Sequence, residues 1–306
     1  MADTDRTASL MTPSKLAQVK PKAPATPAAW LDQMAADAGH AHAQRLTELR
    51  GELLAHGRGR DLSPMVSQLA RLGEALPQLD FGLLQTRGWW ARTTGRSRNA
   101  GTEFARQFEQ IDEVARALGP QAQALQKRLN EQASANDRAQ LELEVEFRAL
   151  DKITDQGTRW LHDMRNQIKV RQAEASDEAG RQQVGNDAAR CEILVARLKV
   201  LRALGSAAQQ AHQQAPAAAA RRAALSKLLS LLASDVKAWQ ASISALAAAA
   251  GNGDAPAPGL DDPMKCHRDL QLRVKQALAD CGELQHQEKV LADSLAAMDA
   301  QFEAGA

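Results

Sequence analysis

Aromatic residues are scarce in this chain. They make up 3% of its 306 residues, and tyrosine is absent. Most of the apolar residues are alanine and leucine, which favour helix over strand. The chain also lacks alternating Val/Ile runs, and no Asn-Gly pair in it lies between two such runs as in a β-hairpin. The composition therefore predicts an all-α protein.

Cysteine and long apolar runs are scarce as well. The three cysteines, Cys191, Cys266 and Cys281, are too few for a disulfide framework and suit a reducing cytosol. The N-terminus has no apolar core of a signal peptide. The longest predominantly apolar run, Ile243 to Ala250, is far shorter than the ~18–20 residues that span a bilayer. We expect a cytoplasmic protein, and a peripheral contact with the inner membrane stays open.

An excess of either charge is also missing, because 38 basic residues face 37 acidic ones and the net charge is +1. A nucleic-acid-binding protein usually has a clear basic excess, so we expect no nucleic-acid partner. The charges are interspersed, as they are on the solvated faces of helices.

A single heptad register near the C-terminus is the strongest pattern present. Steps of four and three residues give an almost unbroken apolar stripe, which predicts a long helix that packs like a coiled coil. Glu288 is the polar exception; such a residue often sets the register or the choice of partner, or lies at the solvent edge. The stripe leaves open whether the helix packs on its own chain or self-associates. Its positions are Leu270, Val274, Ala277, Cys281, Leu284, Glu288, Leu291, Leu295, Met298 and Phe302.

Similar seams run through residues 143–168, 191–212 and 225–250. Glycines and prolines between the seams predict helix boundaries, and short connections predict antiparallel neighbours. We expect an elongated bundle of six to eight long antiparallel helices with coiled-coil-like heptad seams. The predicted boundaries are Gly119-Pro120, the pair Gly180 and Gly185, and Pro216.

Four segments follow from these patterns. Residues 1–26 are rich in Pro, Lys, Thr and Ala and predict a disordered tail. Residues 27–250 form the helical bundle, residues 251–260 a flexible loop, and residues 261–306 the C-terminal heptad helix. Within the bundle, four glycines between Phe81 and Gly101 predict a loop or a short broken helix.

The same glycine-rich segment contains the best candidate for a contact surface. Between Phe81 and Thr102 the chain has two adjacent tryptophans, four arginines and no acidic residue. Trp beside Arg suits a membrane interface, an anion site or a protein contact. The alternative is that one Trp plugs the end of the bundle and the arginines pair with acids elsewhere. The candidate residues are Arg87, Trp89, Trp90, Arg92, Arg96 and Arg98.

Cys266 is the one thiol with a case for redox chemistry. It lies in the first turns of the last helix, where the helix N-terminus and His267 favour a thiolate, although an ordinary surface cysteine is the favoured interpretation. Cys281 and Cys191 lie in apolar seams and are expected in the core. A zinc site made of Cys266, His267, Cys281 and His286 is not expected, because fifteen residues of one helix span about 22 Å.

No phosphate-binding loop, metalloprotease helix or nucleophile elbow occurs in the sequence. No pair of carboxylates stands out as a general acid and base. We therefore expect a protein that is not an enzyme and uses no cofactor.

The order of several segments resembles the TelA-like family of toxic-anion (tellurite) resistance proteins, over roughly residues 60 to 250. Trp239 falls at the tryptophan of the family's Lys/Ile-rich helix. The chain departs from the family in its shorter N-terminal segment and in the Gln/Ala run near Pro216. The resembling segments are LPQLDFG (76–82), EFARQFEQIDEVARAL (103–118), ALDKITDQGTRWLHDM (149–164), ARCEILVARLKVLRALGSAAQQA (189–211) and LSKLLSLLASDVKAWQASISALA (225–247).

The resemblance implies a resistance or stress protein without an established active site. The leading hypothesis is a cytoplasmic helical scaffold that contacts protein partners through its Trp/Arg segment. A membrane-associating or pore-type helical protein is the alternative, and a thiol-dependent oxyanion reductase that uses Cys266 is a weaker one. The sequence identifies neither the anion nor the partner.

Overall fold

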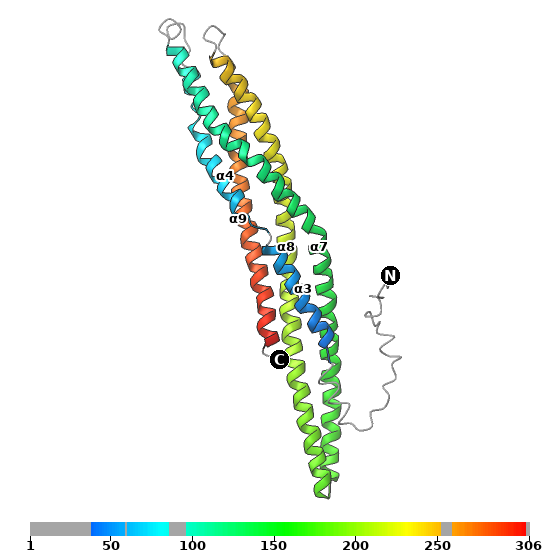
Figure 1. Ribbon diagram of the computed structural model, residues 1–306. Helices are drawn as coiled ribbons and strands as arrows, with labels where there is room; N and C mark the ends of the chain where they lie inside the picture. The colour runs from blue at the N-terminus through cyan, green and yellow to red at the C-terminus, as the bar shows by residue number, and fades with distance from the viewer. Residues whose placement is uncertain (1–37, 59, 86–95, 252–258, 304–306) are drawn as a thin grey trace, which may run out of the picture. The chain divides into compact units, whose positions relative to one another are not determined.

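The computed structural model describes residues 38–58, 60–85, 96–251 and 259–303. The regular elements in these ranges are all helical, which confirms the prediction of an all-α helical bundle. Figure 1 traces them in chain order from α3 in blue to α9 in red. They are α3 (His40–Arg58), α4 (Ser63–Ala75), the short 3-10 helix η2 (Leu76–Gln78), α5 (Gly82–Gln85), α7 (Arg96–Glu174), α8 (Glu178–Gly251) and α9 (Asp261–Glu303).

The chain divides into two compact units. Of the described residues, the first unit contains 38–45, 148–205 and 301–303, and the second contains those from 46 to 147 and from 206 to 300. Helices α7 and α8 each contribute one part to each unit. The predicted tail lies wholly outside the described residues and the predicted loop lies mostly outside them, so both stay predictions.

In the second unit, the long helices pack in antiparallel pairs. Gln240 on α8 donates to Asp112 on α7 (2.7 Å), and Gln126 farther along α7 donates to the carbonyl of Ser226, which lies earlier on α8. Residue numbers therefore rise along one helix while they fall along the other. The ion pair between Arg273 on α9 and Asp235 on α8 (2.8 Å) belongs to the equivalent antiparallel arrangement of those two helices.

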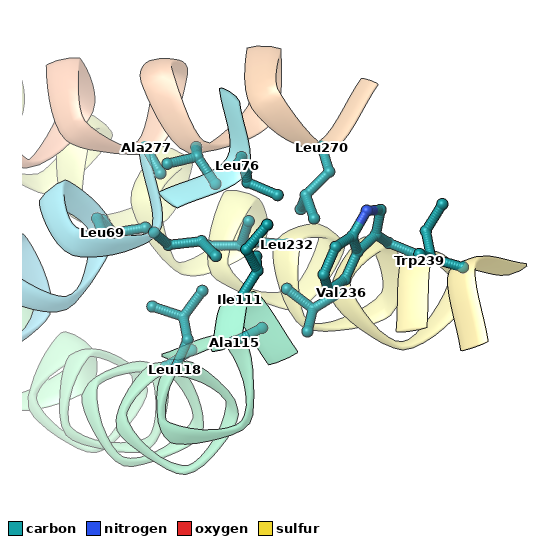
Figure 2. Packing of buried hydrophobic residues seen from close by; sticks show 14 of the residues in the cluster. Leu69, Leu76, Ile111, Ala115, Leu118, Leu232, Val236, Trp239, Leu270 and Ala277 are labelled. Carbon is teal, nitrogen blue, oxygen red and sulfur yellow. The ribbon is translucent and has the colours of Figure 1, made fainter. Parts of the chain in front are cut away.

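One hydrophobic core joins α4, η2, α7, α8 and α9 in the second unit (Figure 2). Trp239 is its largest fully buried side chain. Each buried leucine or isoleucine in such a core contributes about 1.5–3 kcal/mol relative to an exposed one. Labelled members in the figure are Leu69, Leu76, Ile111, Ala115, Leu118, Leu232, Val236, Trp239, Leu270 and Ala277.

The heptad register of the last helix is confirmed within the second unit. Its eight apolar positions from Leu270 to Met298 are buried by the same chain. The apolar stripe of this helix is therefore covered by its own chain, and self-association, the alternative that the sequence left open, would have to use another face of the helix. The seams at 143–168, 191–212 and 225–250 are likewise buried, except that His212 is partly exposed.

The first unit is built on a hairpin formed by the end of α7 and the start of α8. Three residues, Ala175 to Asp177, connect the two helices. The Asp177 carboxylate accepts a hydrogen bond from the Gly180 backbone N–H (3.1 Å) and so caps α8 at its first turn. The predicted turn at Gly180 and Gly185 is wrong by a few residues, because both glycines lie inside α8.

The predicted boundaries at Pro120 and Pro216 are also wrong, because α7 and α8 run through them. A proline inside a helix removes one hydrogen bond and costs about 3 kcal/mol. Both prolines are exposed, so the carbonyl that loses its donor lies on the solvated side. Buried neighbours such as Leu118 and Ala218 keep the helix in the core on either side. The burial of these neighbours thus offsets the cost of the hydrogen bond that is lost at each proline.

The two described ends of the glycine-rich segment from Phe81 to Gly101 are largely helical. Phe81 and Leu84 are buried in the core, and Leu84 lies in the one-turn helix α5. Residues 96–101 form the start of α7. Residues 86–95 lie outside the described part of the chain.

Candidate functional site

The predicted contact surface is only partly within the described structure. Arg87, Trp89, Trp90 and Arg92 lie outside the described residues. Arg96 and Arg98 form part of the first turns of α7, although their side chains are not described. The contact surface therefore stays a prediction.

Glu288, the polar exception in the heptad stripe, is the centre of a buried ion cluster in the second unit. The Arg60 Nε–H donates to its Oε1 (2.6 Å), and the Nη1 of Arg222 lies 3.6 Å from the same oxygen. The Nη1 of Arg60 donates to the Oε1 of Gln132 on α7 (3.1 Å). Arg60 and Arg222 are 5% and 6% exposed, so both guanidinium groups are nearly removed from water.

Two cations around one carboxylate leave this cluster with an excess positive charge. Burial lowers the pKa of the Arg222 guanidinium and Arg60 lowers it further, whereas Glu288 and, to a smaller extent, Asp137 oppose both effects. The cluster connects the α3–α4 junction with α7, α8 and α9. We infer that it favours the observed register of these helices, since a shift of α9 would move Glu288 away from both arginines.

A second polar contact lies deep in the core of the same unit. The Trp239 indole N–H donates to Nδ1 of His267 (3.1 Å), and the ring of Phe81 packs edge-on against the imidazole. An imidazole that accepts this hydrogen bond is neutral. Burial lowers the pKa of His267, and a hydrogen bond to the Leu76 backbone only partly opposes that effect. The position of Trp239, on which the family resemblance partly rests, is thus explained by core packing.

Cys266 does not have the activated environment that its position on the helix suggested. Burial raises the pKa of its thiol, and the carboxylates of Asp235 and Asp269 raise it further. His267 is neutral and so adds no positive charge. The expected lowering of the pKa is wrong, and redox chemistry at Cys266 stays a prediction without that support. The thiol lines a hollow of about 200 Å³ beside Asp262.

The other two cysteines are core residues, as predicted. Cys191 and Cys281 are both buried. Burial raises the pKa of Cys281 to about 11 and also raises that of Cys191. Among the described residues, no group of three or more His, Cys, Asp or Glu side chains is placed to hold a metal ion.

The first unit carries a groove that the sequence analysis missed. Three hollows of about 300, 340 and 320 Å³ lie along the α7–α8 hairpin. The first two share His162 and Arg165, and the last two share Ile168 and Ala188, so they form one continuous groove. We call it the hairpin groove.

Among the charged side chains that line the hairpin groove, five are basic. They are joined by a single acidic residue, Glu192, which accepts a hydrogen bond from Arg165 (2.6 Å). Arg165 and Lys169 are four residues apart, and Lys199 and Arg202 are three apart, so the two residues of each pair lie on the same helix face. This spacing is the feature of the sequence from which the basic face could have been predicted. The basic lining residues are Arg165, Lys169, Arg181, Lys199 and Arg202.

In comparisons with known proteins, no protein-family model, curated protein or solved structure matches this chain. Within the described residues, no helix has an apolar stretch long enough to cross a bilayer.

Proposed function

We propose that this protein is a non-enzymatic helical scaffold that contributes to tolerance of toxic oxyanions such as tellurite. The proposal takes its biological role from the resemblance between residues 60 and 250 and the TelA-like family. It takes its mode of action from the distribution of polar groups in the structure. The reducing cytoplasm is the compartment that three unpaired cysteines favour.

The observation that carries the scaffold proposal is the contrast between the polar core and the open surface. In the second unit, buried polar side chains are hydrogen-bonded to each other: Trp239 donates to His267, and Arg60 donates to Glu288. The hairpin groove, by contrast, is open and lined with exposed cations. Such a division suits a protein that acts by binding partners on its surface.

Growth on graded tellurite tests the role. A deletion strain is complemented with the wild-type gene, with an Arg87→Ala, Arg92→Ala, Arg96→Ala variant, or with a matched control. The control changes three exposed arginines elsewhere, Arg138, Arg159 and Arg268, to alanine. We expect the deletion to lower tolerance, and the wild type and the control to restore it.

The outcomes test the resistance role and the predicted contact surface separately. If deletion leaves tolerance unchanged, the resistance role is wrong. If deletion lowers tolerance but the Arg87, Arg92 and Arg96 variant restores it fully, the role stands and the predicted contact surface is wrong.

Peripheral membrane association is the second candidate, because the cations of the hairpin groove would attract anionic lipids. Flotation with vesicles that contain phosphatidylserine distinguishes the two. A scaffold stays in the soluble fraction, whereas a membrane-associating protein floats with the vesicles.

A further inference from the structure

We propose that the hairpin groove is the docking site for an acidic amphipathic helix of a partner protein. The inference deepens the scaffold function and rests on it, because it names the surface and the chemistry of the partner. It stands on the shape of the groove, on its apolar floor and on the sign of the charge along its rim.

The groove exists because two helices cannot cover each other completely. In the hairpin, one stripe of each helix is buried in the shared seam, and the shoulders beside the seam stay open. The floor of the groove consists of the outer edges of seam residues, among them Leu161, Ile168 and Leu198. Val195 adds a partly exposed apolar side chain.

The dimensions suit a helix. The groove follows α7 from Thr158 to Gln172, and fifteen residues at 1.5 Å each correspond to about 22 Å, or four turns. A third helix laid along this line would place apolar residues at every third or fourth position on the floor. A third helix packs against a two-helix seam in this way.

The charge along the rim selects the partner. Residues 148–205 contain eleven basic and eight acidic residues, and five of the basic residues but only one acidic residue line the groove. The rest of the hairpin is therefore slightly acidic, and the positive charge is concentrated at this face. Acidic side chains flanking an apolar stripe would pair with the rim, as residues beside a coiled-coil seam do.

The existing ion pairs at the rim do not block such a partner. Arg165 pairs with Glu192 and Arg202 with Asp155 (3.5 Å), and all four side chains are at least half exposed. Exposed pairs of this kind contribute about 0–1 kcal/mol, so a docking helix can replace them at little cost. An apolar floor between two cationic rims favours an amphipathic helix over a phosphate backbone, which has no apolar stripe to bury.

Fluorescence anisotropy with the full-length protein tests the proposal. The probe is a labelled amphipathic peptide of about 21 residues, with Leu at the seam positions and Glu beside them. Its control has the same Leu residues and Lys in place of Glu. We expect the acidic peptide to bind, with an affinity that falls as salt rises, and the basic peptide not to bind.

Charge reversal locates the binding surface. Lys169→Glu with Lys199→Glu changes two exposed rim residues and should weaken binding of the acidic peptide by roughly tenfold or more. The matched control is Lys152→Glu with Arg159→Glu, two exposed residues of the same hairpin outside the groove, which should bind like the wild type. Circular dichroism verifies that both variants keep their helices.

Three results would overturn the proposal. Equal binding of the acidic and basic peptides would show that charge does not select the occupant. Vesicle binding that depends on Lys169 and Lys199, without peptide binding, would assign the groove to anionic lipid. A dimer in sedimentation that the same two changes abolish, again without peptide binding, would assign it to a second copy. The tellurite assay is independent, so failure of the resistance role and failure of the groove are distinguishable.

Discussion

At the scale of single residues, His267 makes the core of the second unit sensitive to pH. Its pKa is lowered in the folded protein by burial, so the unfolded chain binds more protons between the lowered value and about 6.5. The neutral imidazole contributes fully to the free energy of unfolding above about pH 6.5, and this contribution is lost as the pH falls through the pKa of the folded state. Protonation would also end the hydrogen bond that Trp239 donates.

We therefore expect the wild type to lose stability between pH 8 and pH 5.5 more steeply than a His267→Gln variant, whose amide oxygen can still accept from Trp239. Urea unfolding at several pH values measures this. His286→Gln, which changes an exposed histidine of the same unit, should keep the wild-type slope. Parallel slopes for all three proteins would contradict the assignment.

Glu288 is the second residue for which burial decides the energetics. Glu288→Gln would remove the carboxylate that pairs with both Arg60 and Arg222 and leave the two guanidinium groups buried side by side. Breaking a buried ion pair in this way costs about 3–5 kcal/mol, and we expect a loss of that order in the free energy of unfolding.

The matched control for this change is Glu283→Gln, which removes a half-exposed carboxylate that lies 3.8 Å from Arg221. It should cost about 0–1 kcal/mol. Denaturant titration of both variants checks the prediction, and similar small losses would show that the cluster around Glu288 is well hydrated.

At the scale of the helix, two glycines of the hairpin should respond in opposite ways to the same substitution. Gly157 lies on α7 against Leu198, and an added Cβ would come within 2.8 Å of that side chain. Gly185 lies inside α8 with nothing within 4 Å of an added Cβ. Alanine removes backbone freedom from the unfolded chain and favours helix by about 0.5–1 kcal/mol.

Gly185→Ala should therefore stabilise the hairpin by about 0.5–1 kcal/mol. Gly157→Ala should lower stability by about 1–3 kcal/mol, the usual cost of overpacking, because α7 and α8 must separate or Leu198 must move. Thermal unfolding of the two variants gives the comparison directly. A stabilising Gly157→Ala would mean that the helices are not in close contact there.

At the scale of the whole molecule, the two units differ in how their apolar residues are shared. The large core cluster, whose largest fully buried side chain is Trp239, belongs entirely to the second unit, where several helices cover one another. The first unit relies mainly on the seam of a two-helix hairpin. A narrower core supports less cooperative protection of the backbone amides.

Hydrogen exchange followed by mass spectrometry should therefore show faster exchange in residues 148–205 than in residues 225–246 at neutral pH. Apart from the connection at Ala175 to Asp177, both segments are helical, so the difference reports packing rather than secondary structure. Equal protection of the two segments would mean that the hairpin is as stable as the core.

Periodicity alone determined most of the fold. The residues of the stripe from Leu270 to Met298 lie buried as predicted, because an apolar face every three to four residues has no stable place except in a helical seam. Local signals were less reliable. Pro120 and Pro216 indicated helix ends, yet α7 and α8 continue, because burial on both sides of each proline outweighs one lost hydrogen bond.

Only the tertiary structure decided which polar residues meet. Arg60 and Glu288 are 228 positions apart, and no spacing rule relates them. Trp239 and His267 lie on different helices, and Lys169 and Lys199 reach one groove only because the hairpin turn at Ala175 to Asp177 sets the helix register. A helical pattern fixes which face of a helix is buried, whereas contacts between helices depend on register and crossing, and those follow from packing the whole chain.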